Sequence, residues 1–218
     1  MLLEHIEHTT AANPDACIIW LHGLGADGND FAGIVPDLKL PPELRLRFIF
    51  PHAPYRPITL NNGHVMRGWY DLKNLDIGSA EDDIGIRESA DQINDFIEHQ
   101  VKQGIKRHRI ILAGFSQGGA VALYTGLRQA ETLGGIVALS TYIPLVGNPA
   151  SEIITDRALP LFMAHGLHDD VVKYQYGTQG RVWLQQQGYQ VDWHDYPMAH
   201  SVCMEEITDI RQWIVARL

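Results

Sequence analysis

The chain has 218 residues, of which 45% are hydrophobic and 20% are charged, and its formal net charge is -9. This length and composition predict one globular domain over residues 1–218 with a full hydrophobic core. The basic residues are scattered and outnumbered, so nothing resembles the electrostatic footprint of a protein that binds nucleic acid or an anionic membrane surface.

The N-terminal segment and the cysteines exclude further classes. The segment MLLEHIEHTT has acidic residues and histidines where a signal peptide needs a basic start followed by an apolar stretch. No segment approaches the roughly 20 apolar residues of a membrane span. The two cysteines, Cys17 and Cys203, are too few for a disulfide framework. We therefore expect a cytoplasmic protein with free thiols and no stable membrane anchor.

Apolar runs of strand length alternate along the chain with amphipathic stretches of helix length. This pattern predicts an α/β fold with a mainly parallel central sheet and helices on both faces. The expected strands lie at residues 17–21, 46–50, 110–113, 135–139, 160–164 and 189–193. The expected helices lie at residues 83–102, after Gly119, over the stretch 171–187 that Gly177 and Gly180 interrupt, and from about Glu205.

The segment from residue 51 to residue 82 shows neither a helix period nor a strand period. It is longer than the connections that compact domains usually leave without regular structure, and such long segments are often functional. A packed surface insertion is the alternative. The residues alone leave both interpretations open.

One serine stands among glycines in the segment GFSQGG, residues 114–119, between an expected strand and an expected helix. This context is typical of a nucleophile elbow, in which a sharp turn strains the serine backbone and small neighbours let strand and helix pass closely. Ser116 would then be a nucleophile. The alternative is a glycine-rich turn whose serine caps the following helix.

A serine nucleophile needs a base and an acid that orients the base, and in this type of fold the acid precedes the histidine along the chain. The loops after the last two expected strands supply both kinds of residue. We favour His200 as the base, because its loop can fold back over the serine, with His168 as the next choice. For the acid, the spacing favours Asp169 over Asp170, although either could instead cap the following helix.

The reaction also needs N–H donors in place for the oxyanion. One is expected from the backbone of Gln117, the residue after the serine, and the other from the glycine-rich loop at residues 21–28. That loop has neither a G-x-G-x-x-G pattern nor a P-loop lysine. Nucleotide binding is therefore a weak alternative.

These motifs follow one another over nearly the whole chain, which resembles the carboxylesterase and acyl-protein thioesterase family of α/β-hydrolases, also called phospholipase/carboxylesterase. The matching segments are LHGLGADGNDF (21–31), FPHAP (50–54), RGWYD (67–71), EDDIGI (81–86), RIILAGFSQGGAVALYTGL (109–127), HGLHDDVV (165–172) and YPMAHSV (196–202).

The resemblance implies a role for each residue of the site. Ser116 would be the nucleophile, Asp169 the orienting acid and His200 the base. The backbone N–H groups of Leu24 and Gln117 would form the oxyanion hole. The family pattern, HG followed by two residues and then the catalytic Asp, decides between the two adjacent carboxylates.

The chain departs from the family pattern beside the acid. Asp170 and Lys173 stand where many members have proline. An extra carboxylate next to Asp169 could alter its pKa or the geometry of the loop.

The resemblance also shifts the interpretation of residues 51–82 towards function, since the RGWYD-like segment lies along the acyl-binding groove in the family. Trp69, Leu72 and Leu75 become candidate wall residues of that groove, although Trp69 could simply belong to the core.

The expected function is a serine hydrolase that cleaves carboxylic esters or acyl thioesters through an acyl-enzyme, without a metal or an organic cofactor. Its substrate would be a small ester, a thioester or an acylated protein, and an exposed apolar groove would favour a homodimer. Two rivals remain. One is a metal-dependent hydrolase that uses the cluster His165, His168, Asp169 and Asp170. The other is a non-catalytic ligand-binding protein on the same scaffold.

Overall fold

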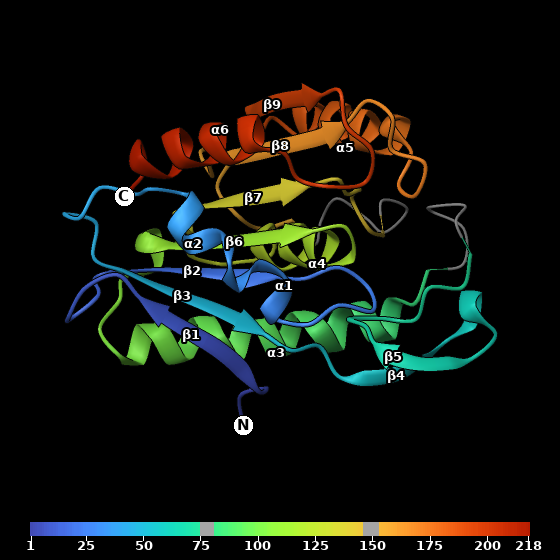
Figure 1. Cartoon of the computed structure of the whole chain (residues 1–218), viewed down its shortest axis with the longest axis horizontal. Coiled ribbons are helices and arrows are strands. Elements are labelled where there is room, and N and C mark those ends of the chain that lie inside the picture. Colours follow the sequence, from blue (N-terminus) through green and yellow to red (C-terminus); the bar gives the residue numbers. More distant parts are fainter. Residues whose placement is uncertain (75–80, 146–152) are drawn as a thin grey trace.

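The computed structural model describes residues 1–74, 81–145 and 153–218. Within these ranges one sheet of seven strands runs in the order β1 (His5–Thr9), β3 (Leu46–Pro51), β2 (Ala16–Leu21), β6 (Ile110–Phe115), β7 (Gly135–Leu139), β8 (Leu161–Gly166) and β9 (Val191–Tyr196) (Figure 1). Only the β1–β3 pair is antiparallel among these neighbours. This arrangement confirms the predicted α/β fold with a mainly parallel sheet.

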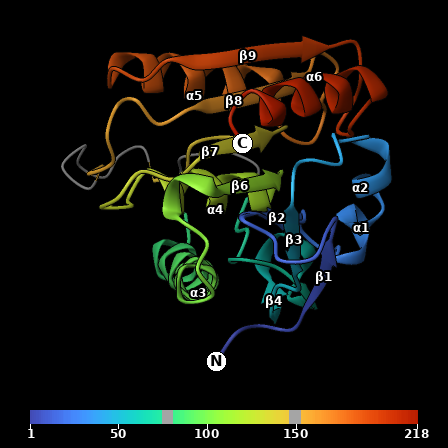
Figure 2. The same cartoon turned by 90° about the vertical axis from the view of Figure 1, so that its left-hand side faces the viewer.

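Helices cover both faces of the sheet, as Figure 2 shows. One face carries α3 (Asp83–Lys102), α4 (Gln117–Gly126) and α5 (Tyr174–Gln186), and the other carries α1 (Asn29–Ala32), α2 (Ile34–Asp37) and α6 (Met204–Val215). Strand β2 shows why both faces need a cover of helices, because its apolar side chains alternate between the two faces. Ile19 belongs to the core on the first side and Ile18 to the core on the second, and both are fully buried.

Each predicted strand and helix is present, with ends that shift by a few residues. The glycines of α5 do not interrupt it. Both Gly177 and Gly180 lie buried inside the helix, where a Cβ on Gly177 would lie 2.4 Å from His165 Nδ1. A Cβ on Gly180 would lie 3.0 Å from Ile143 Cγ1. These glycines therefore serve close packing of α5 rather than a break in the helix.

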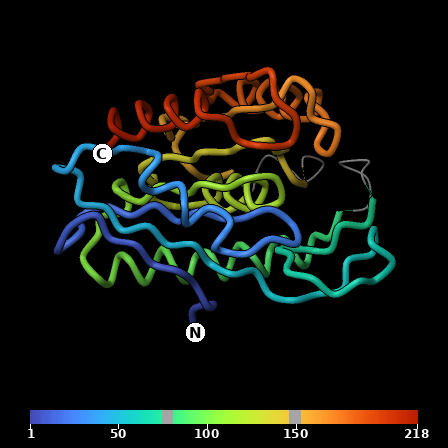
Figure 3. The backbone as a smooth tube through the Cα atoms, in the orientation of Figure 1, coloured from blue at the N-terminus to red at the C-terminus, as the bar shows by residue number. Residues whose placement is uncertain are grey.

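Sequence patterns missed several short elements. Strand β1 is exposed at most positions and has no apolar run, since it lies at the edge of the sheet. Inside the segment expected to lack regular structure, β4 (Tyr55–Ile58) and β5 (His64–Arg67) form an antiparallel hairpin closed by the 3₁₀ turn η1 (Thr59–Asn61). Figure 3 traces this hairpin beyond the carboxyl end of β3, at the same end of the sheet as the carboxyl end of β6.

No helix in the described ranges is long and apolar enough to cross a membrane.

Glycines let the β6–α4 turn cross the chain after β2 at very short distance. A Cβ on Gly114 would lie 2.4 Å from the Gly118 carbonyl carbon. One on Gly118 would lie 2.5 Å from the carbonyl oxygens of Leu21 and His22. Side chains do not approach rigid backbone atoms so closely. The predicted reason for these glycines, close passage of strand and helix, is confirmed.

We expect Gly118→Ala to lower the free energy of unfolding by about 1–3 kcal/mol, because the added methyl group forces two backbone segments apart. Gly33→Ala is the matched control, since Gly33 has a helical φ of -69° and nothing lies within 4 Å of its ideal Cβ. Urea unfolding measures both. Equal stability of Gly118→Ala and the parent protein would contradict the close-passage account.

Candidate active site

Ser116 stands in a strained backbone conformation between β6 and α4. Its φ is 55° and its ψ is -121°, a region that costs a non-glycine residue about 1–3 kcal/mol. The Ser116 N–H donates to the Leu139 carbonyl at 2.9 Å, and the Thr141 hydroxyl donates to the Ser116 carbonyl at 2.6 Å. Although Ser116 occupies the N-cap position of α4, its side chain makes no capping hydrogen bond. The helix-cap interpretation is therefore wrong.

Asp169 and His200 meet across the loops that follow β8 and β9. His200 Nδ1 lies 2.7 Å from Asp169 Oδ2. Since an ionised carboxylate only accepts, Nδ1 carries a hydrogen, which in a neutral imidazole leaves the lone pair on Nε2. The two loops approach closely because Gly166 has no side chain, and a Cβ there would lie 2.4 Å from the Ala199 carbonyl oxygen.

The His200 ring lies beside the serine elbow. It packs on Phe115, the residue before Ser116, with ring centroids 4.6 Å apart. Both Ser116 and His200 are described, and no hydrogen bond joins their side chains. Such a bond is often long before substrate binds.

The Asp169 carboxylate is fully buried and held from both sides. Its Oδ1 accepts the N–H groups of Val171 and Val172 at 2.9 and 2.8 Å, and His165 Nε2 lies 3.4 Å from its Oδ2. Burial alone would raise the pKa of this carboxyl, but the hydrogen bonds from His165 and His200 outweigh burial and hold the pKa well below its usual range. Asp169 is therefore ionised at neutral pH.

The residues that flank Asp169 in the sequence are not buried with it. His168, Asp170 and Lys173 are exposed, and Lys173, not either aspartate, occupies the N-cap of α5. The alternative that an aspartate caps this helix holds only for the turn that precedes α5, where the Asp169 carboxylate accepts the N–H groups of Val171 and Val172. In the part of the chain that the structure describes, no group of three or more His, Cys, Asp or Glu side chains is arranged to hold a metal ion.

The glycine-rich loop after β2 lies against the serine. An ideal Cβ on Gly23 would lie 3.6 Å from the Ser116 Cβ. Leu24 follows in this loop, and Gln117 begins α4. Among the described residues, neither the Leu24 N–H nor the Gln117 N–H has a hydrogen-bond partner. Two backbone donors on neighbouring segments thus remain available beside Ser116.

His22, which sequence reasoning did not single out, holds this loop. Its Nδ1 lies 2.7 Å from the Gly23 carbonyl oxygen, and its Nε2 accepts the Ala53 N–H at 3.0 Å. Burial lowers the pKa of His22 to about 4, so the imidazole is neutral and Nδ1 carries its hydrogen. The available signal was a histidine directly after a buried strand and before a glycine.

A small cavity of about 70 Å³ opens beside the serine. Its described lining residues are Leu24, Tyr70, Leu72, Asn74, Ser116, Gln117, Tyr142, Val171 and Val172.

The structure describes two of the three residues expected to form the groove wall and places them in different surroundings. Leu72 lines the cavity. Trp69 does not, because it is fully buried in the core and its indole N–H donates to the His22 carbonyl at 2.9 Å. Leu75 lies outside the described residues.

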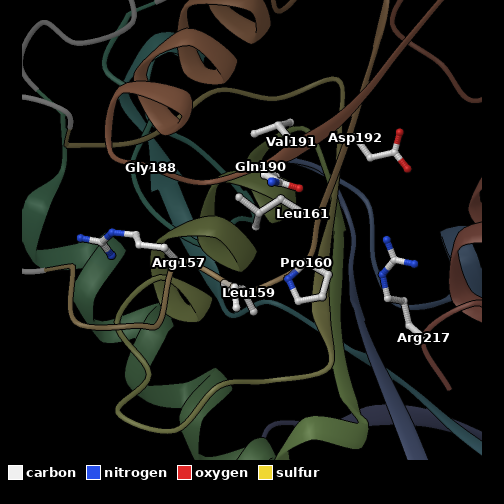
Figure 4. A pocket seen from close by; sticks show the side chains of 10 residues that line it. Arg157, Leu159, Pro160, Leu161, Gly188, Gln190, Val191, Asp192 and Arg217 are labelled. Atoms are coloured by element: carbon white, nitrogen blue, oxygen red, sulfur yellow. The ribbon is translucent and has the colours of Figure 1, made fainter.

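A larger hollow of about 600 Å³ lies at the other end of the strands, where β8 and β9 begin (Figure 4). Arg157 and Arg217 stand on opposite sides of it, and Pro160 and Leu161 lie between them. It contains none of the predicted site residues, and it lies at the amino-terminal ends of these strands, whereas Ser116 follows the carboxyl end of β6.

Known proteins resemble this chain over nearly its whole length. The family model described as Phospholipase/Carboxylesterase matches residues 5–218. A protein named acyl-protein thioesterase 1 from Neurospora crassa is 41% identical over 219 residues, which cover 95% of this chain and 89% of that protein. A protein of the same name from Yarrowia lipolytica is 38% identical over 205 residues, covering 91% of this chain and 90% of the relative.

Solved structures agree with this similarity. The crystal structure of SOBER1 from Arabidopsis thaliana has a TM-score of 0.87 at 30% identity, covering 93% of this chain and 98% of that one. The structure of acyl-protein thioesterase 2 from Zea mays has a TM-score of 0.87 at 26% identity and covers 99% of both chains. The chain therefore belongs to the phospholipase/carboxylesterase family of α/β-hydrolases and is a hydrolase of that family.

Proposed function

We propose that this chain hydrolyses acyl thioesters and carboxylic esters through an acyl-enzyme on Ser116, with His200 as the base and Asp169 as the acid that orients it. The 2.7 Å hydrogen bond between Asp169 and His200, beside a serine in a strained elbow, is the observation that carries the proposal. A buried, ionised carboxylate fixes the imidazole tautomer and stabilises the imidazolium that forms during the reaction.

The reaction proceeds in two acyl transfers. Ser116 Oγ attacks the carbonyl carbon while its proton passes to His200 Nε2, and the alcohol or thiol then leaves with that proton. Water attacks the acyl-enzyme in the same way, giving up a proton to His200 as the acid is released and Ser116 recovers its hydrogen. The N–H groups of Leu24 and Gln117 stabilise the negative oxygen of each tetrahedral intermediate.

The cavity suggests what the site accepts. Several of its walls are apolar, including Leu24, Leu72 and Val172, which suits the hydrocarbon of an acyl group. The similarity to proteins named acyl-protein thioesterase 1 adds a protein-bound acyl thioester as a substrate class. We propose that the acyl chain enters this cavity while the thiol or alcohol part, on a small molecule or a protein, stays outside.

Replacement of the nucleophile tests the proposal directly. We expect Ser116→Ala to lose at least about 10⁴-fold in the hydrolysis of p-nitrophenyl esters and of an acyl thioester, and to resist labelling by a fluorophosphonate. Ser201→Ala is the control, because Ser201 is an exposed hydroxyl in the loop that carries His200. Turnover retained by Ser116→Ala would contradict the proposal.

The two adjacent aspartates separate the acid from its neighbour. Asp169→Asn should reduce kcat by about 10³–10⁴-fold, because the amide no longer holds the correct imidazole tautomer. Asp170→Asn should stay within about twofold of the parent protein, since Asp170 is exposed. Steady-state kinetics on one ester compares both variants, and a large loss confined to Asp170→Asn would reverse the assignment.

The charge state of His22 tests whether a neutral imidazole holds the loop that carries Leu24. Its pKa of about 4 lies below the ordinary value of about 6.5, so His22 should stay neutral, with hydrogen on Nδ1, at pH 5.5. The unfolded chain takes up this proton first, so the His22 contribution to stability should be lost as the pH falls from about 6.5 to about 4. Nitrogen NMR of the labelled imidazoles measures the charge, and a protonated His22 at pH 5.5 would contradict the account.

A further inference from the structure

The side chain of Gln117 makes contacts that the proposed role of its backbone does not require. It is only 5% exposed, and its amide binds the main chain of two consecutive residues. Oε1 accepts the Trp69 N–H at 2.8 Å, and Nε2 donates to the Tyr70 carbonyl at 2.8 Å. The residue after the nucleophile thus clamps a segment far from it in the sequence.

The clamped segment also binds the loop that carries Leu24. The Gly25 N–H donates to the Arg67 carbonyl at 2.8 Å, and the Trp69 indole donates to the His22 carbonyl at 2.9 Å. The contact is close as well as polar, because an ideal Cβ on Gly68 would lie 2.9 Å from Leu24 Cδ1. Residues 67–70 therefore bridge the two segments that present the proposed oxyanion donors.

The same segment leads into the wall of the cavity. Tyr70 lines the cavity, and its hydroxyl meets that of Tyr142 at 2.6 Å. Burial raises the pKa of both phenols, so both stay neutral at physiological pH. Leu72, two residues further, lines the same cavity. The Gln117 amide fixes the backbone of this wall, and the Tyr142 hydroxyl fixes the phenol of Tyr70.

We propose that the Gln117 side chain is a positioning residue that holds the wall of the acyl cavity in register with Ser116, and that this clamp determines how sharply the enzyme discriminates between acyl chains of different length. The inference rests on the proposed acyl transfer at Ser116 and extends it to specificity.

The chemistry of the clamp requires an amide of this length. It must present one acceptor to the Trp69 N–H and one donor to the Tyr70 carbonyl. Methionine fills similar space but supplies neither, which leaves two buried backbone groups without partners. An ionised glutamate keeps the acceptor but turns a second oxygen towards the carbonyl, whereas a protonated glutamate restores the donor.

The test compares Gln117→Met with Gln129→Met across p-nitrophenyl esters from acetate to decanoate. Gln129 is the matched control, because it is a buried glutamine just beyond α4 that donates to Asn94 Oδ1 at 2.7 Å and to the Thr125 carbonyl at 3.0 Å, but it does not line the cavity. We expect the ratio of the best to the worst kcat/KM to fall by about fivefold or more in Gln117→Met, which is the size of effect that one of the two lost buried hydrogen bonds contributes.

The same ratio should be unchanged within about twofold in Gln129→Met, even if that variant is equally destabilised. A flat chain-length profile in the parent protein, an unchanged ratio in Gln117→Met, or equal flattening in Gln129→Met would overturn the inference.

Gln117→Glu adds a reversible form of the same test. Burial raises the pKa of a carboxyl group, so this side chain should pass from neutral to ionised between about pH 5 and pH 9. The chain-length ratio should match the parent protein at the low end and Gln117→Met at the high end. The ratio compares esters at one pH, so a pH effect that is common to all the esters cancels. A ratio independent of pH would count against the clamp.

Labelling separates this inference from the proposed function. Fluorophosphonate should still react with Ser116 in both Gln117 variants, which also reports that the site is folded. Turnover retained by Ser116→Ala would overturn the proposed function and this inference with it. Complete loss of turnover in Ser116→Ala, together with an unchanged chain-length profile in Gln117→Met, would overturn this inference alone.

Discussion

The contact on which the site depends is between Gly118 and the backbone after β2. An ideal Cβ on Gly118 would lie 2.5 Å from the carbonyl oxygens of Leu21 and His22, so the first turn of α4 and the end of β2 touch main chain to main chain. This approach brings the Leu24 loop beside Ser116. An oxyanion hole built from backbone N–H groups needs the segments that carry them to lie this close together, because an N–H group acts only over the length of a hydrogen bond.

Close backbone contact leaves buried polar groups that must find partners, and side chains from distant segments supply them. His22 accepts the Ala53 N–H, Trp69 donates to the His22 carbonyl, and Gln117 binds both Trp69 and Tyr70. A buried group without a partner costs more than the bond itself contributes. This network joins the Ser116 elbow, the loop with the proposed oxyanion donors and the cavity wall through buried hydrogen bonds.

The sequence predicts the centre of this molecule better than its edges. Strands such as β6 are buried on both faces and read as unbroken apolar runs, whereas β1 and the β4–β5 hairpin are exposed and show no such pattern. The chain order of Ser116, Asp169 and His200 indicates which loops meet, and the structure brings the last two into hydrogen-bond contact. Trp69 illustrates the limit, because only the fold shows that it lies in the core. Likewise, no local pattern reveals the bonds from the Gln117 side chain to Trp69 and Tyr70, which join residues distant in sequence.

A covalent intermediate on Ser116 is the central claim, and rapid chemical quenching followed by peptide mass spectrometry tests it most directly. The protein is mixed with a p-nitrophenyl ester of a long acyl chain, quenched in acid during the first turnover and digested. The account predicts the mass of one acyl group on the peptide that contains Ser116, absent when His200 is replaced by alanine. No adduct during turnover, or an adduct carried by Cys203, would contradict it.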